Sequence, residues 1–207
     1  MELQPRDRDF LEVLTLRVRT LSLGQVARTW WQGRSQSVRQ AQQRITVLVE
    51  AGLLELNHLR AHPELSLDAP LAVWHGGQPP PGFGELARCL RARWSNEAED
   101  TTFVTATRSA GNDLGGHGGR RPRISEATHD LHLAAVYLRM RSELPTRARS
   151  WMPEFALRGM PGERVPDALV RDGRYNTAIE FGGEYPEEKL RLFHEDCARR
   201  GRGYEIW

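Results

Sequence analysis

The 207-residue sequence contains few cysteines, few lysines and no long apolar run. Cys89 and Cys197 are its only cysteines, and neither belongs to a CxxC pair. This spacing argues against a structural zinc site, and free thiols are typical of a reducing compartment. No stretch approaches the roughly 20 apolar residues that a membrane helix needs. The charged N-terminus is also unlike a signal peptide. We therefore expect a soluble, cytoplasmic protein with no membrane partner.

Lysine occurs once, at Lys189, so arginine supplies every other basic side chain. A GC-rich coding bias explains this preference without any functional cause. Acidic residues are also missing from one long stretch, between Glu12 and Glu50. The six arginines in that stretch are Arg17, Arg19, Arg28, Arg34, Arg39 and Arg44. A local positive excess of this kind favours a polyanionic partner, although the net charge of the chain is only +2.

Three early segments carry apolar residues at helical spacing. We expect helices over residues 6–18, over residues 23–31, and from a cap at Ser35 or Ser37 to Ala51. A hairpin of two strands is expected next, at 53–59 and 70–74. Three short helices followed by a hairpin is the order of a winged helix-turn-helix. The segment RITVLVEAGLLEL resembles the end of the recognition helix and the start of the wing in bacterial regulators of that fold.

The face that the third helix is expected to expose carries side chains able to read the major groove of DNA. Glutamine can pair with adenine, and arginine with guanine, through two hydrogen bonds each. The candidates for base contacts are Gln36, Arg39, Gln40 and Gln43. The candidates for phosphate contacts are Arg28, Arg34, Ser35 and Arg44. Two alternatives are that these side chains only solvate an outer helix face, and that the fold binds a protein partner.

The middle of the chain is rich in proline and glycine. We expect a winged-helix domain at 1–76, a linker with a short helix and a strand at 77–124, and a third segment at 125–207. Within the linker, residues 108–125 are rich in glycine and arginine and are expected to be flexible.

The C-terminal segment has the element order α-β-β-β-α-β. The expected helices are 126–143 and 186–200, and the expected strands are 151–157, 164–171, 175–181 and 204–207. The turn at 172–174 favours a hairpin between the second and third strands. This order is that of the PD-(D/E)XK nuclease core. The expected fold class is therefore α+β, with an N-terminal winged helix-turn-helix followed by a PD-(D/E)XK-like domain.

Two acidic residues stand where such a nuclease binds metal. Asp167 begins the second strand and Glu180, thirteen residues later, ends the third. Converging carboxylates suit Mg²⁺, and Glu154 is the candidate third ligand. A nuclease of this class has lysine two residues after the glutamate, whereas this chain has Gly182 there. Lys189 could replace that lysine as a titratable amine. The alternative is an inactive site in which Lys189 is an ordinary solvated residue.

Together these residues resemble the replication-relaxation family of plasmid and mobile-element proteins, in which a winged helix is joined to a domain of this type. The matching segments are His129-Asp130-Leu131, Trp151-Met152-Pro153-Glu154, Pro166-Asp167-Ala168, Ile179-Glu180-Phe181 and Glu188-Lys189-Leu190. With the winged-helix segment included, the resemblance spans most of the chain, but each motif is short.

The resemblance implies a regulator of transcription or replication that binds double-stranded DNA without a cofactor. Its nuclease-like domain would be non-catalytic and would serve dimerisation, DNA contact or a protein partner. A homodimer is expected only by analogy with other winged-helix regulators. One alternative is a Mg²⁺-dependent endonuclease that uses Asp167, Glu180 and Lys189. Another is an adaptor that recruits proteins through the nuclease-like domain.

Overall fold

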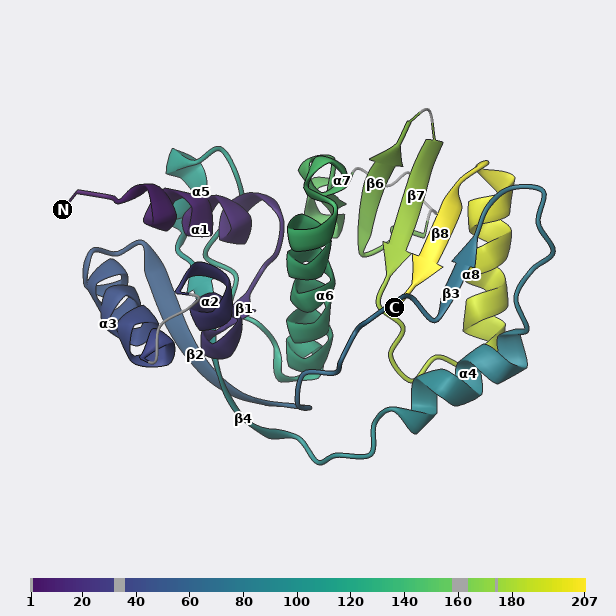
Figure 1. Ribbon diagram of the computed structural model, residues 1–207, viewed down its shortest axis with the longest axis horizontal. Coiled ribbons are helices and arrows are strands. Elements are labelled where there is room, and N and C mark those ends of the chain that lie inside the picture. Colours follow the sequence, from purple (N-terminus) through teal and green to yellow (C-terminus); the bar gives the residue numbers. More distant parts are fainter. Residues whose placement is uncertain (1, 32–35, 158–163, 174) are drawn as a thin grey trace. The chain divides into compact units, whose positions relative to one another are not determined.

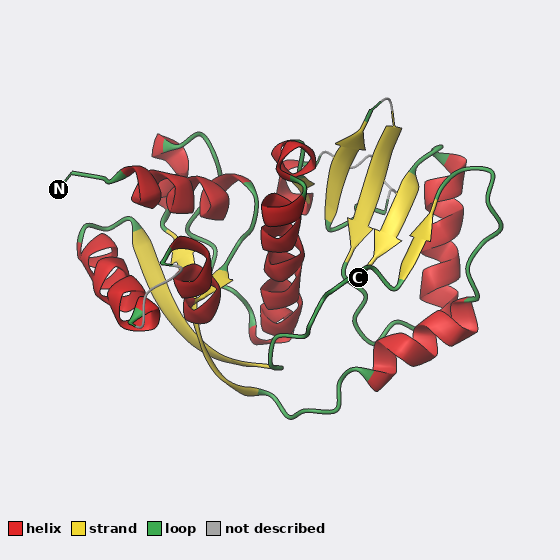
Figure 2. Ribbon diagram, in the orientation of Figure 1, coloured by secondary structure: helices red, strands yellow, loops and turns green. Residues whose placement is uncertain are grey.

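The chain divides into two compact units, each built from two separate segments (Figure 1). The computed structural model describes residues 2–31, 36–157, 164–173 and 175–207. The first unit comprises Met1–Pro63 and Ala98–Leu138, and the second comprises Glu64–Glu97 and Arg139–Trp207. This division differs from the expected consecutive segments 1–76, 77–124 and 125–207. The mixture of helices and sheets confirms the expected α+β class (Figure 2).

The first unit begins with three helices, as the apolar spacing predicts. They are α1 (Pro5–Leu16), α2 (Leu23–Trp30) and α3 (Ser37–Glu50), with the short strand β1 (Leu21–Ser22) before α2. The hydroxyl of Ser22 accepts a hydrogen bond of 3.1 Å from the backbone N–H of Gln25, which caps α2. The chain leaves α3 at Gly52, whose φ of 74° favours glycine.

The sheet of the first unit has the order β1-β4-β2, and its strands are antiparallel. Strand β4 (Glu99–Ala106) pairs along the whole of β2 (Leu54–Ala61), from Leu54 opposite Ala106 to Ala61 opposite Glu99. The prediction that residues 70–74 pair with 53–59 is therefore wrong. Residues 72–74 instead form β3 (Ala72–Trp74), which joins the sheet of the second unit. The longer β4 matches all eight residues of β2, which a three-residue strand cannot do.

The glycine-rich segment after β4 packs closely against its neighbours in the first unit. It begins with α5 (Arg108–Asp113). Beyond it, the N–H of His117 donates to Thr15 O at 2.8 Å, and the N–H of Gly119 donates to Ala106 O at 2.8 Å. A Cβ atom at Gly118 would overlap the carbonyl group of Thr107. Glycine is needed here because the backbone passes so close to its neighbours.

The core of the first unit lies among its helices and sheet. Its largest fully buried side chains include Phe10, Leu11, Ile45, Leu48, Leu54 and Phe103. Helix α6 (Ile124–Glu143) contributes Leu131, whose carbonyl accepts a 2.8 Å hydrogen bond from the buried Gln25 side chain. Val38 is 51% exposed although it is apolar, because it lies in the first turn of α3.

The second unit contains a five-stranded mixed sheet of order β3-β8-β7-β6-β5 (Figure 2). Strands β7 and β8 are parallel, and the other neighbours are antiparallel. The remaining elements are α4 (Phe83–Ala92), α7 (Pro145–Arg149), β5 (Met152–Pro153), the 3-10 turn η1 (Glu154–Ala156), β6 (Ala168–Asp172), β7 (Tyr175–Glu180), α8 (Glu187–Arg199) and β8 (Gly203–Ile206). The expected hairpin of β6 and β7 is confirmed. The expected strand at 151–157 is reduced to two residues, since Pro153 has no N–H for a ladder.

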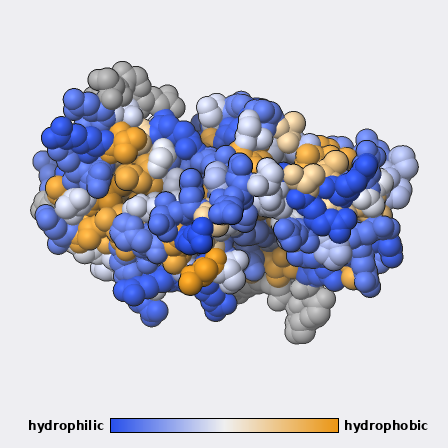
Figure 3. Space-filling model, turned by 90° about the horizontal axis from the view of Figure 1, so that it is seen from below, coloured by the Kyte–Doolittle hydropathy of each residue, from blue (hydrophilic) through white to orange (hydrophobic). Residues whose placement is uncertain are grey.

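Hydrophilic residues cover most of the face seen in Figure 3, and hydrophobic residues gather there in separate patches. The large hydrophobic residues that are exposed include Val38 and Val47, both on α3. No helix within the described residues is long and apolar enough to span a membrane.

Candidate nucleic-acid interface and acidic site

Helix α3 has one buried side and one polar, exposed side. Ala41, Ile45 and Leu48 are buried, and α3 packs against α2. Gln36, Arg39 and Gln43 are exposed, and Gln40 is half-buried. The four predicted base-contacting residues therefore lie on the side of α3 away from its buried residues, where a ligand could reach them.

Of the predicted phosphate contacts, Arg28 and Arg44 are described. Arg28 is exposed in the last turn of α2. Arg44 is half-buried and forms a two-point ion pair with Asp7 of α1, through its Nε at 3.0 Å and its second guanidinium nitrogen. Arg44 thus ties α3 to α1, which is a structural role that the sequence did not indicate. Arg34 and Ser35 lie outside the described residues.

The Asp7 carboxylate is fully buried and depends on its partners. Burial by itself would raise the pKa of Asp7. The hydrogen bonds from Arg44 and from the backbone N–H of Gln4, with the charge of Arg44, together lower that pKa below its ordinary value. Asp7 is therefore held as a carboxylate inside the helical core of the first unit.

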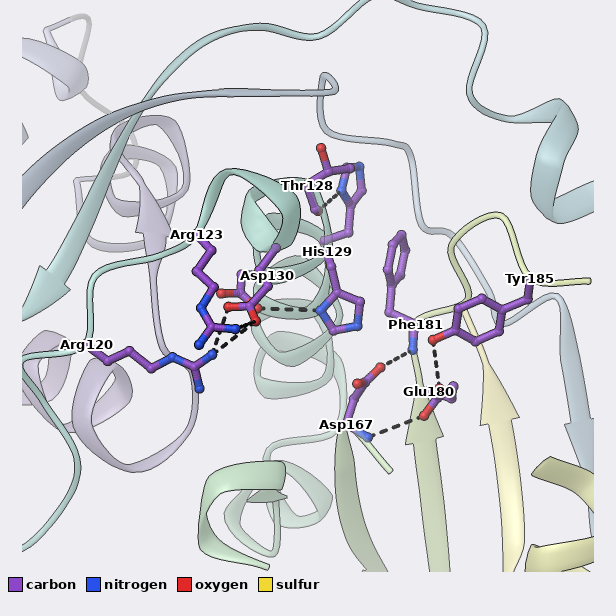
Figure 4. Close-up of polar contacts among 11 residues, drawn as sticks. Arg120, Arg123, Thr128, His129, Asp130, Asp167, Glu180, Phe181 and Tyr185 are labelled. Carbon is purple, nitrogen blue, oxygen red and sulfur yellow. Dashed lines mark hydrogen bonds and ion pairs between the residues drawn. The ribbon is translucent and has the colours of Figure 1, made fainter. Parts of the chain in front are cut away.

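In the second unit, the β6–β7 hairpin brings Asp167 and Glu180 together, as predicted. Ala168 pairs with Ile179, so Asp167 lies beside Glu180 at the same end of the hairpin. The N–H of Phe181 donates to Asp167 Oδ2 at 2.7 Å, and the N–H of Asp167 lies 3.4 Å from Glu180 Oε2 (Figure 4). Each carboxylate thus receives a backbone donor from the other residue's strand.

Two residues that follow β7, Tyr185 and Lys189, lie close to Asp167 and Glu180 and form an acidic cluster with them. The hydroxyl of Tyr185 donates to Glu180 Oε1 at 2.9 Å (Figure 4). Lys189 Nζ stands 3.2 Å from the centre of the Tyr185 ring. Burial raises the pKa of Tyr185, and the charges of Glu180 and Asp167 raise it further, so the phenol keeps its proton. Burial also lowers the pKa of Lys189, with a contribution from Arg164, against the opposing effect of both carboxylates.

Gly182, where the sequence comparison with PD-(D/E)XK nucleases expects a lysine, packs against another part of the second unit. A Cβ atom at Gly182 would lie 2.8 Å from Leu90 of α4 and 3.2 Å from Ile206 of β8. Beyond α4, the Arg93 guanidinium donates to the carbonyls of Gly182 and Trp207 and lies over the Phe181 ring. Burial lowers the pKa of Arg93 to about 10. A lysine at position 182 would have to displace these groups.

Glu154, the candidate third metal ligand, is exposed in η1. Its backbone N–H donates to Asp167 O at 2.8 Å, so its backbone is close to the cluster. The described residues contain no group of three or more histidine, cysteine or acidic side chains arranged to hold a metal ion. The donor set that the structure brings together is the pair Asp167 and Glu180.

Sequence reasoning missed Tyr185 and Arg93 as members of this cluster. Tyr185 follows Glu180 by five residues in a loop that has no periodic pattern. Arg93 comes from a distant part of the chain, so no local signal could have connected it to Gly182. The chain matches no family model, no curated protein and no solved structure.

Proposed function

We propose that this protein binds double-stranded DNA through the exposed face of α3, and that it regulates transcription or replication of a plasmid or another mobile element. The observation that carries the proposal is the polar face of Gln36, Arg39 and Gln43 on a helix within an acid-free stretch. An exposed helix with these side chains fits the width and the donor–acceptor pattern of the major groove.

The topology of the first unit supports this proposal. Helices α2 and α3 pack together, and the order β1-β4-β2 is that of a winged helix-turn-helix, with β2 and β4 as the wing. By analogy with that fold, our proposal takes α3 as the recognition helix and the exposed Arg28, in the last turn of α2, as a phosphate contact. The mobile-element role rests on the resemblance to the replication-relaxation family.

We propose a non-catalytic role for the second unit, in dimerisation, DNA contact or binding of a protein partner. The order of β5 to β8 and α8 supports a PD-(D/E)XK-like fold. However, Asp167 and Glu180 receive hydrogen bonds from Phe181 and Tyr185, and Gly182 is packed against Leu90. These contacts favour a site that stabilises the sheet end over one that cleaves DNA.

Two arginine substitutions test the DNA-binding proposal on a duplex selected from a random pool. Arg39→Ala should weaken binding to the selected site by roughly tenfold or more, because a base contact is worth about 1–3 kcal/mol. Arg28→Ala should weaken binding to all duplexes and reduce the salt dependence by about one phosphate contact. Fluorescence anisotropy over a salt series measures both effects.

Arg88→Ala is the matched control, because Arg88 is an exposed arginine of α4 in the second unit. It should leave affinity and salt dependence unchanged if the duplex contacts the first unit alone, and a reduced salt dependence would instead indicate DNA contact by the second unit. If the wild-type protein binds no duplex in a salt-sensitive way, the proposal is refuted.

The competing function is a Mg²⁺-dependent endonuclease, favoured by the closeness of Asp167 and Glu180 and by the lowered pKa of Lys189. Asp167 and Glu180 would hold the ion, which would act as a Lewis acid toward a phosphodiester. Lys189 would orient a water molecule. We expect no Mg²⁺-dependent nicking of supercoiled plasmid by the wild-type protein. Nicking that Glu180→Ala abolishes, and that the exposed control Glu188→Ala retains, would show that the site is catalytic.

A further inference from the structure

The exposed face of α3 carries a stripe of like residues, and it continues beyond the predicted base-contacting positions. Gln36, Gln40, Gln43 and Val47 follow one another at intervals of four, three and four residues, which places them on one side of a helix. Val47 is 38% exposed although it is apolar. At 1.5 Å per residue the stripe is about 16 Å long. That length corresponds to roughly five base pairs at 3.4 Å each.

The chemistry of this stripe is selective among base pairs. The glutamine amide can donate to adenine N7 and accept from adenine N6–H₂, and an apolar group can contact the 5-methyl group of thymine. Three glutamines and one valine thus match A·T pairs, and only Arg39 matches guanine. Glu50, the last residue of α3, places a negative charge at the far end, so Val47 is the last residue of the stripe that we expect to contact DNA.

We infer that α3 recognises a half-site of about five base pairs that is dominated by A·T, with a single G·C pair read by Arg39. This inference rests on the proposed function and adds the sequence class of the DNA. It also assigns Val47 a role in specificity, through contact with a thymine methyl group. Gln36, Gln40 and Gln43 are the adenine-reading residues.

The first test is selection of bound duplexes from a random pool, followed by base-analogue substitution in the selected half-site. Replacing the adenines in turn by 7-deazaadenine removes N7, and replacing thymine by uracil removes the methyl group. We expect the deaza substitution to weaken binding by roughly tenfold at one or more positions, and uracil by a smaller factor at one position. The 7-deazaguanine substitution should matter at one guanine alone.

Matched variants connect each effect to a side chain. With Gln43→Ala, one 7-deazaadenine position should lose its effect, and with Val47→Ala the uracil substitution should become neutral. Gln42→Ala is the control. Gln42 is exposed on the same helix, and about 100° per residue places it to the side of Gln43. It should leave every analogue effect in place. Circular dichroism would verify that each variant is folded.

The results of these experiments distinguish a failure of the A·T inference from a failure of the proposed DNA binding. Salt-sensitive binding to half-sites dominated by G·C, or binding that no base analogue changes, would overturn the A·T inference and leave DNA binding intact. Absence of binding to any duplex would refute both, and would instead favour a protein partner for the same face.

Discussion

Replacing Arg44 with alanine is expected to lower the free energy of unfolding by about 3–5 kcal/mol, since it leaves the Asp7 carboxylate buried without its charged partner. Asp7 is 0% exposed, and Arg44 binds both of its carboxylate oxygens. The N–H of Gln4 also donates to Asp7, at 2.8 Å, but it carries no charge. Chemical denaturation followed by circular dichroism would measure the loss.

A double variant separates the cost of an unpaired charge from the loss of packing. Asp7→Leu combined with Arg44→Met removes both charges and keeps apolar volume, so it should recover most of the lost stability. The double variant should also bind DNA with an unchanged salt dependence, because Arg44 contacts Asp7 and not phosphate in the proposed complex. A salt dependence reduced by one contact would instead restore Arg44 to the DNA interface.

The ion pair of Asp7 and Arg44 should make the free energy of unfolding depend on pH. The pKa of Asp7 is lowered in the folded state, so its contribution to stability is present above the pKa of the unfolded state, near 3.9. That contribution is lost as the pH falls through the lowered folded pKa. The free energies of unfolding of wild type and Arg44→Ala should therefore converge in strong acid, where the charge pair no longer contributes to stability.

Replacing Gly118 with alanine is expected to lower the free energy of unfolding by about 3 kcal/mol, because the new methyl group would overlap the Thr107 carbonyl. The obstruction is backbone, so no side-chain rotation can relieve it. The loop would have to move away from β4, and the hydrogen bond from Gly119 to Ala106 would be strained with it. Thermal unfolding would register the change.

Gly24→Ala is the matched control in the same unit. Gly24 lies in α2, and the nearest atoms to an added Cβ are 3.7 Å away, which is ordinary contact. Alanine is favoured over glycine inside a helix by about 0.5–1 kcal/mol, so this variant should be neutral or more stable. If Gly118→Ala behaves like Gly24→Ala, the loop is not packed as described.

Local sequence patterns predict the helices and the hairpin turn of this chain well, because these elements depend on residues that are close in the sequence. The apolar spacing locates α1, α2, α3 and α6, and the turn at 172–174 identifies the β6–β7 hairpin. The partner of β2 could not be chosen in this way. Residues 70–74 and 99–106 both have strand character, and the choice depends on long-range pairing and on the burial of Phe103.

In the candidate sites, too, local patterns predict some features, and long-range contacts decide the others. Asp167 and Glu180 could be placed together because a hairpin joins their strands. The exposed face of α3 follows from helical periodicity. The ion pair of Arg44 with Asp7 joins residues that are 37 positions apart, and charge counting had assigned Arg44 to phosphate. Leu90 and Arg93 contact Gly182 from the first half of the chain, so the packing around Gly182 depends on tertiary structure that local patterns do not predict.

The middle position of β4 in its sheet has a consequence for the order in which the chain can fold during synthesis. Strands β1 and β2 both pair with β4 and not with each other, so neither has a partner until residues 99–106 have left the ribosome. In the interval, β2 is an open strand edge on a nascent chain, the kind of surface that chaperones cover and that promotes aggregation. A fragment ending at residue 76 would remain permanently in that state. Expression of α3 in a folded first unit therefore requires the chain through β4.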